Sequence, residues 1–395
     1  MDAHFREVLE LLLRWVHLIA GIMWIGNSML FNWLDRNLVE PEDKKPLSQG
    51  EIWMVHSGGF YQVEKKLLPP HQLPRQLHWF MYQNLTTWVS GVFLLLVIYY
   101  LGGRAYMVDP AVSRIATDNA IALGVGTIVV SWLVYDTLWR SPLGKRDALA
   151  AGVSLGLLGA VAFGLCQVLS GRAAYIHVGV VLGTVMTGNV WFRILPAQTE
   201  LVEATRSGRD QDPALGYAAK QRSIHNNYMT FPLLFIMLSN HYPSTFGGRL
   251  NWVVLAVLMA GGAGVRHFMN IRFWYRPWLP ALAATAGASV LGLWALTRPA
   301  PPPGAGGPAV PFHRVQTIIE ERCVPCHSVS PTDTTYTAPP NGVLFDTPEE
   351  IVRHAERIRQ RAVVAASMPL GNKTGMTQEE RDLVGRWVAQ GARRR

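Results

Sequence analysis

The sequence of 395 residues contains few cysteines and few charges. Only three residues are Cys, and no second Cys/His cluster with zinc spacing accompanies Cys323 and Cys326, so a four-ligand zinc site would lack half of its ligands. The third, Cys166, lies in an apolar run and is expected to be a small buried residue. The net charge is +9, but the basic residues are scattered between apolar stretches, so nucleic acid is not an expected partner.

The chain is rich in apolar residues. Hydrophobic residues make up 49% of the chain and charged residues 16%, which is unlike an ordinary soluble domain. The sequence predicts an all-α fold, in which residues 1–297 form a polytopic bundle of eight transmembrane helices in a lipid bilayer. The first stretch has no basic segment before it and no small-residue cleavage site, so we interpret it as a retained span. The eight stretches are 9–33, 77–101, 118–139, 148–170, 173–195, 224–242, 250–270 and 278–297.

The composition changes after Thr297. Residues 298–310 form a Pro/Gly-rich linker, and residues 311–395 are polar enough for a small separate domain. This domain contains the pentad "CVPCH", Cys323 to His327. In Cys-x-x-Cys-His the two thiols add across the vinyl groups of a haem, and the histidine ligates the iron. We therefore predict one covalent haem c on Cys323 and Cys326, with His327 as the proximal iron ligand.

The segments around the pentad are typical of a small class I-like cytochrome c domain. Thr347 and Thr377 are predicted helix N-caps, and Glu380 completes a capping box with the second. Met368, in the loop "SMPLGN", is the predicted second iron ligand, and Met376 is the alternative. A thioether opposite histidine raises the potential, which suits an electron acceptor. A redox dithiol would need a βαβ setting that this segment lacks. The expected helices are 311–323, 347–366 and 377–392.

Two arguments agree on orientation. Haem attachment of this type occurs outside the bacterial cytoplasmic membrane, so the C-terminal domain, and with eight spans also the N-terminus, should be periplasmic. The loops that would then be cytoplasmic carry 17 Lys and Arg residues, and the outer segments carry five. The sequence therefore predicts a multi-pass protein of the bacterial inner membrane.

Polar residues inside the apolar stretches are candidate functional groups, because they usually face the interior of a bundle. Neutral imidazoles on facing helices can hold a b-type haem or another metal, whereas the alternative is interhelical hydrogen bonding. Asp118 and Asp136, at the two ends of the third stretch, are expected to be solvated carboxylates. The candidates for haem b or a metal are His17, His78, His177 and His225, and His267 lies in a similar position.

A weak internal repeat supports pairing these histidines. His17 and His177 are each followed by a Gly-Asn pair, and "RQLH" opens the second stretch as "RSIH" opens the sixth. A parallel 4+4 duplication would produce this pattern. The long loop 35–76 is expected to be an amphipathic segment on the membrane surface, with a substrate-contacting lid as the alternative.

Three segments carry a resemblance to a known family. The stretches "LRWVHLIAGIMWIGNSMLFNWLDR", "EIWMVHSGGFY" and "MPLGNKTGMTQEER" are similar to the membrane-bound bacterial urate oxidase (urate hydroxylase) family. This resemblance implies oxidation of urate to 5-hydroxyisourate in purine breakdown. Electrons would pass through the fused cytochrome to the respiratory chain, by way of a soluble cytochrome c or a terminal oxidase, rather than to dioxygen.

A second, weaker similarity concerns the first stretch alone. "HLIAGIMWIG" resembles the first span of haem-binding membrane protoporphyrinogen oxidases and of copper-resistance membrane proteins, which puts His17 first among the metal or haem candidates. Two other functions stay open on the residues alone. One is an electron-transfer subunit of a respiratory complex without its own substrate site, and the other is a haem- or copper-handling transporter with a redox sensor domain. No catalytic residue is assigned.

Overall fold

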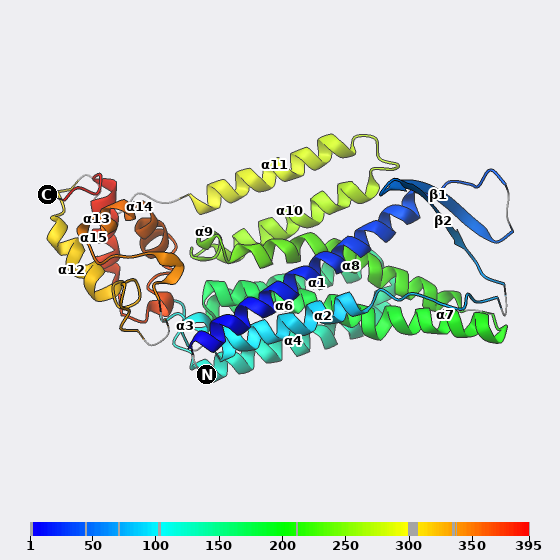
Figure 1. Cartoon of the computed structure of the whole chain (residues 1–395), viewed down its shortest axis with the longest axis horizontal. Helices are drawn as coiled ribbons and strands as arrows, with labels where there is room; N and C mark the ends of the chain where they lie inside the picture. The colour runs from blue at the N-terminus through cyan, green and yellow to red at the C-terminus, as the bar shows by residue number, and fades with distance from the viewer. Residues whose placement is uncertain are drawn as a thin grey trace.

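The structure is a computed structural model that describes residues 3–43, 46–69, 72–101, 104–210, 212–298, 307–333, 336 and 338–394. Most of these residues are helical, and the chain forms a long bundle with a group of short helices at one end (Figure 1). Long helices run along the axis of the bundle, and a two-stranded hairpin lies at the opposite end from the short helices. The predominantly helical architecture that the sequence predicts is therefore confirmed.

The bundle contains the long helices at the positions where apolar stretches predict them. Two of them continue through a short π-helical segment, η1 after α2 and η3 after α6. The long elements are α1 (Ala3–Asn37), α2 (Tyr82–Leu94) with η1 (Leu95–Tyr100), α4 (Thr117–Arg140), α5 (Asp147–Val168), α6 (Gly171–Asn189) with η3 (Val190–Ile194) and α7 (Leu195–Ser207), α8 (Pro213–Ser239), α10 (Asn251–Ile271) and α11 (Trp278–Thr297). The short connecting elements are α3 (Arg104–Met107), η2 (Pro142–Lys145) and α9 (Pro243–Phe246).

Within the described residues, seven helices are long and apolar enough to cross a membrane. The eighth predicted stretch, 224–242, lies largely in α8, which has 27 residues but is not among the seven. The reason is that α8 turns polar residues toward the inside of the bundle, where Arg222, Asn226, Asn227 and Thr230 are buried. These polar groups lower the mean hydropathy of α8. They are not exposed to lipid, because α8 packs against α6 and α10.

Helix α6 is the centre of the bundle. Fourteen of its 19 residues are buried, and it packs against α2, α4, α5 and α8. A helix that is apolar all round is expected in such a position. Close approach at its C-terminal end depends on Gly188, because a Cβ there would lie 2.6 Å from the indole ring of Trp132 on α4.

Both ends of the chain lie at one end of the bundle. Figure 1 places the N-terminus beside the group of short C-terminal helices, and the hairpin and α7 at the other end. This arrangement agrees with an even number of crossings. Which end faces the outside of a cell stays a prediction.

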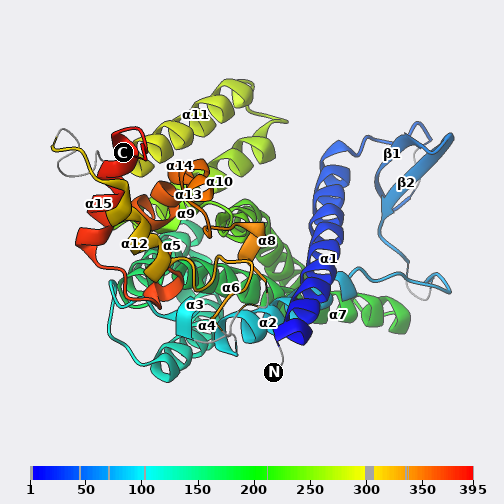
Figure 2. The same ribbon diagram turned by 60° about the vertical axis from the view of Figure 1, so that its left-hand side comes forward.

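The loop 35–76 differs from the prediction, because it forms an antiparallel hairpin of β1 (Ser48–His56) and β2 (Gly59–Lys66). Ser57 and Gly58 form the two-residue turn with φ of 51° and 76°, values typical of a type I′ turn. The hairpin stands clear of the bundle near the end of α1 (Figure 2), and Lys65 pairs with Asp35 at 2.7 Å. The all-α prediction is therefore wrong for this segment. The expected position of the segment on the membrane surface, and the lid as its alternative, stay predictions.

The C-terminal helices have their own hydrophobic core, which includes the fully buried Val315, Ile319, Val384 and Trp387. Thr347 and Thr377 are both N-caps as predicted. The predicted capping box at Thr377 is present, and Thr347 forms a second one with Glu350. The predicted helix 347–366 is broken into three pieces. The elements are α12 (Phe312–Arg322), η4 (Pro340–Gly342), α13 (Pro348–Arg353), α14 (Ala355–Ile358), η5 (Arg359–Val364), η6 (Leu370–Asn372) and α15 (Gln378–Ala389). Residues 299–306 of the predicted linker lie outside the described residues, so the domain boundaries at 297 and 311 stay a prediction.

Candidate functional site

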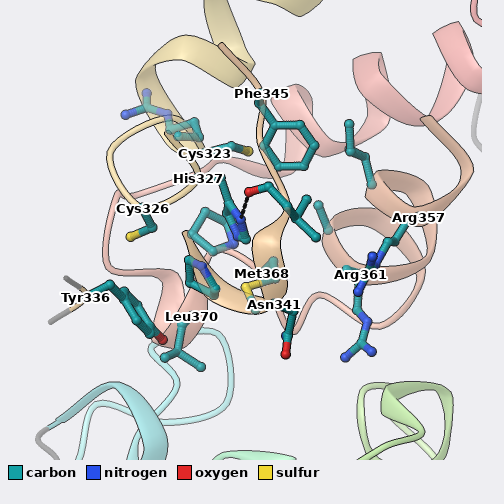
Figure 3. A pocket seen from close by; sticks show the side chains of 16 residues that line it. Cys323, Cys326, His327, Tyr336, Asn341, Phe345, Arg357, Arg361, Met368 and Leu370 are labelled. Atoms are coloured by element: carbon teal, nitrogen blue, oxygen red, sulfur yellow. Dashed lines mark hydrogen bonds between the residues drawn. The ribbon is translucent and has the colours of Figure 1, made fainter. Parts of the chain in front are cut away.

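A mostly apolar pocket in the C-terminal helices brings the predicted haem ligands together. Cys323, Cys326, His327 and Met368 all line it, although 41 residues separate the last two in sequence (Figure 3). The free space is about 840 Å³ with its open mouth included.

His327 is held by a backbone carbonyl and an aromatic ring. Its Nδ1 is hydrogen-bonded to the Val343 carbonyl at 3.0 Å, and Phe345 packs 5.1 Å from it between ring centres. Because Nδ1 is engaged, Nε2 is the nitrogen for a metal. Burial lowers the pKa of His327, and the nearby charges of Arg357 and His354 lower it further. The hydrogen bond to the Val343 carbonyl raises the pKa but does not offset these effects. The imidazole is therefore neutral at pH 7, the state that ligates iron.

The two cysteines are free thiols on either side of one turn of chain. Cys323 ends helix α12, and the His327 N–H donates to its carbonyl at 2.9 Å. Burial raises the pKa of Cys323 to about 12, and burial together with Asp333 raises the pKa of Cys326. A redox dithiol instead has a lowered thiol pKa, so these surroundings oppose that alternative.

The two methionines occupy different environments. Met368 follows η5 and borders the pocket. Its N–H donates to the Arg361 carbonyl at 3.0 Å, and its carbonyl accepts from Arg381 Nη1 at 2.7 Å. Met376 is 2% exposed within the hydrophobic core and does not line the pocket. The geometry therefore favours Met368 over Met376 as a ligand.

These residues fit a c-type haem. Two thiols, one neutral imidazole and one thioether border a single, mostly apolar pocket. Arg357 and Arg361 also line it and are labelled in Figure 3, where they could pair with the carboxylates of a porphyrin.

The four histidines predicted for haem b or a metal lie apart from one another in four local environments. His17 Nδ1 is hydrogen-bonded to Ser90 and to the Thr87 carbonyl on α2, and His78 is exposed just before that helix begins. Both ring nitrogens of His177 are engaged, Nδ1 with the Ala173 carbonyl at 2.8 Å and Nε2 with the Tyr100 hydroxyl at 3.0 Å.

His225 completes the set. Its Nδ1 is 2.7 Å from the Tyr135 hydroxyl, and its ring lies 4.1 Å from that of Trp139. Among the described residues no group of three or more His, Cys, Asp or Glu side chains could hold a metal ion. Of the four, only His177 has both ring nitrogens engaged and would have to give up a hydrogen bond to ligate a metal. A second haem in the bundle stays a prediction.

The comparison with known families decides the identity of the bundle. Residues 3–296 match the family model described as urate oxidase N-terminal, which covers about three quarters of the chain. The chain belongs to the urate oxidase N-terminal family. No curated protein and no solved structure matches it.

The urate oxidase N-terminal region touches the C-terminal pocket through aromatic side chains. Tyr336 lines the pocket and interacts with Tyr106 of α3. Tyr106 lies 6.0 Å from Tyr99 between ring centres, and Tyr99 lies 6.3 Å from His177. Arg172 covers both Tyr99 and Tyr106, at 5.9 and 4.9 Å from their ring centres. Ring contacts thus lead from His177 in the centre of the bundle to Tyr106, which interacts with Tyr336 at the pocket.

The urate oxidase N-terminal region contains a buried ion cluster that the sequence does not predict. Asp118 is exposed as expected, but Asp136 is 8% exposed and pairs with Arg193 and Arg222. The expectation of a solvated Asp136 is therefore wrong. The available sequence signal is weak: a lone Asp and a lone Arg within apolar stretches. The pairing itself is not visible in the sequence, because Arg193 and Arg222 lie 57 and 86 residues after Asp136.

Proposed function

We propose that this chain oxidises urate to 5-hydroxyisourate within a membrane. The electrons then pass to a c-type haem in the C-terminal domain and onward to a respiratory acceptor outside the membrane. The observation that carries this proposal is the occurrence in one chain of two parts. The first is a urate oxidase N-terminal region, and the second is a pocket lined by Cys323, Cys326, His327 and Met368.

We also propose eight crossings. The seven apolar helices and the 27-residue α8 run between the same two ends of the bundle in Figure 1. Eight crossings return the chain to the side on which it starts, which agrees with the shared position of the N-terminus and the C-terminal helices. The prediction of a periplasmic C-terminal domain then follows from haem attachment and from the distribution of positive charge.

The proposed reaction balances without dioxygen. Urate takes an oxygen atom from water and releases two electrons and two protons to form 5-hydroxyisourate. A c-type haem supplies one-electron acceptance, so each urate would require two transfers. The packed rings of Tyr99 and Tyr106, with Tyr106 interacting with Tyr336 at the pocket, offer a route between the bundle and the pocket for those transfers.

Anaerobic spectroscopy of the purified full chain tests this function. Addition of urate should reduce the c-type haem, which a spectrum follows directly, and the product should be 5-hydroxyisourate. If the haem is reduced by dithionite but stays oxidised after urate is added, the proposal is contradicted. The same result would favour an electron-transfer subunit without a substrate site.

The double variant C323A/C326A provides the matched control. Loss of both thiols should remove the porphyrin mass from the chain and abolish reduction by urate. The bundle should stay in the membrane fraction, because its core and that of the C-terminal helices are separate. Loss of the whole chain from the membrane would contradict this modular interpretation.

A further inference from the structure

A buried polar centre lies in the half of the bundle farther from the C-terminal pocket. We call it the Arg222 centre, and it consists of Tyr135 and Asp136 on α4, Asn189 at the end of α6, and Arg222 and His225 on α8. Arg222 is 3% exposed and Asn189 is fully buried. Polar groups in such a position are costly unless they are satisfied.

Positive charge exceeds negative charge at this centre. The carboxylate of Asp136 accepts from Arg193 Nε at 2.7 Å and from Arg222 Nη2 at 3.3 Å, and Arg140 is 3.9 Å away at the exposed edge. One carboxylate therefore faces at least two close guanidinium groups. The side chain of Arg222 is the most deeply buried of the three arginines, with 4% exposed. The local excess of positive charge suits an anionic ligand.

Two buried polar atoms of the centre have no hydrogen-bond partner within the described part of the chain: Arg222 Nη1 and Asn189 Oδ1. The first is a donor and the second is an acceptor. A buried donor or acceptor without a partner is destabilising, so each calls for a partner group. A carbonyl or anionic oxygen would satisfy the first atom, and an N–H would satisfy the second.

Aromatic rings pack within and around the Arg222 centre. The Arg222 guanidinium lies 4.9 Å from the ring centre of Tyr135, whose hydroxyl accepts from Asn189 Nδ2 at 3.0 Å. Trp132 packs 6.2 Å from Tyr135, and Trp139 packs on His225. Flat apolar faces beside polar edges are the surroundings that a planar heterocycle needs.

The backbone is irregular at the same place. The π-helix η3 begins at Val190, directly after Asn189, and contains Arg193. Single π-turns inside α-helices occur frequently at functional sites, because they re-aim side chains at a modest cost in helix stability. Here the irregular turn accompanies the pairing of Arg193 with Asp136.

We propose that the Arg222 centre binds the substrate, an anionic purine trione, by the edge that carries adjacent C=O and N–H groups. Arg222 Nη1 donates to the oxygen, Asn189 Oδ1 accepts from the N–H, and the aromatic rings pack on the face of the heterocycle. This proposal rests on the proposed function, because it names where urate is held.

Binding to the dithionite-reduced full chain tests the proposal without turnover, since a reduced haem accepts no electron. Calorimetric titration with urate should show binding to the wild-type chain. Arg222→Gln should weaken it about 10–100-fold, because a hydrogen bond to a charged group is lost. Asn189→Leu should weaken it about tenfold. The matched control is Arg266→Gln, which removes another buried arginine, one that donates to Asn227, and should leave urate affinity unchanged.

A second measurement addresses the acceptor and protects the test against a misfolded variant. Singly N-methylated urates lack one N–H each. At least one of them should bind the wild type more weakly than urate does, because it cannot donate to Asn189. The same compound should bind N189L as tightly as urate binds N189L. If R222Q fails to fold, Arg222→Lys keeps the charge and should bind urate with intermediate affinity.

The outcomes separate the two proposals. Wild-type affinity in both R222Q and N189L would overturn the binding site and leave the proposed function standing. If R266Q lost as much affinity as R222Q, the effect would be general and the site would also be overturned. A wild-type chain that neither binds urate nor is reduced by it would overturn the proposed function itself.

Discussion

Replacing Asp136 with Asn should destabilise the bundle far more than its size suggests. The side chain of Asp136 is 11% exposed and is the only acidic partner of Arg222 and Arg193 among the described salt bridges. Removing its charge leaves the guanidinium of Arg222 buried without a counter-ion. Breaking a buried ion pair from one side costs about 3–5 kcal/mol. Arg193 is 30% exposed and can be hydrated, so it adds little to that cost.

The matched control is Arg140→Gln in the same cluster. Arg140 is 65% exposed and 3.9 Å from Asp136, so its loss should cost about 0–1 kcal/mol. Thermal unfolding of both purified full-length variants in one detergent measures the contrast. The melting temperature falls by about 2–4 °C per kcal/mol for chains of roughly 150–250 residues and by less for longer chains, so D136N should melt several degrees lower than the wild type. If D136N and R140Q melted together, the ion cluster would not stabilise the bundle and the reasoning would be refuted.

Three further predictions concern other parts of the chain. Met368→Leu should lower the reduction potential of the haem by removing a thioether ligand, whereas Met376→Leu should not, and equal potentials in a redox titration would contradict the assignment. Partial burial raises the pKa of Glu380, but hydrogen bonds from Arg322 and a backbone N–H outweigh it and lower that pKa below its usual range. A lowered carboxyl pKa stabilises the fold above the unfolded value of about 4.3, and this stabilisation disappears as the pH falls through the folded value. Glu380→Gln should therefore cost about 1–3 kcal/mol at neutral pH and little in acid, as hydrogen exchange of α15 would show; a cost independent of pH would oppose this. Gly58→Val should destabilise the hairpin by about 1–2 kcal/mol because φ is +76° there, and unchanged protection of the hairpin amides would argue otherwise.

The helical parts of the fold follow from local sequence. Long apolar stretches predict the helices of the bundle, because a hydrophobic surface of that length must be buried or face lipid. The capping boxes at Thr347 and Thr377 predict the starts of two C-terminal helices, because the residues that satisfy the first turn are three positions apart. Local rules suffice where both partners lie within one turn.

Other features depend on contacts that sequence does not display. The hairpin is missed because its signal, a two-residue turn at Ser57 and Gly58 between alternating residues, is short and lies in a polar loop. His78 is placed in a span by composition, but α2 begins only at Tyr82, after the prolines and polar residues of the preceding loop. The pairing of Asp136 with Arg222 joins residues 86 apart.

The candidate haem site is intermediate between these cases. The pentad fixes Cys323, Cys326 and His327 by spacing alone. The choice between Met368 and Met376 needs the fold, because both lie in the same loop region and only the first borders the pocket. The Arg222 centre could not be predicted, because unpartnered atoms exist only in three dimensions.

Titration of the oxidised full chain with urate, without dioxygen or any other acceptor, tests the central claim most directly. One haem per chain and two electrons per urate require that one molecule of urate reduces two chains, with one molecule of 5-hydroxyisourate formed. A haem spectrum that changes to completion at this ratio is the predicted result. Consumption of urate only after dioxygen is admitted, with the haem unchanged, would contradict the account.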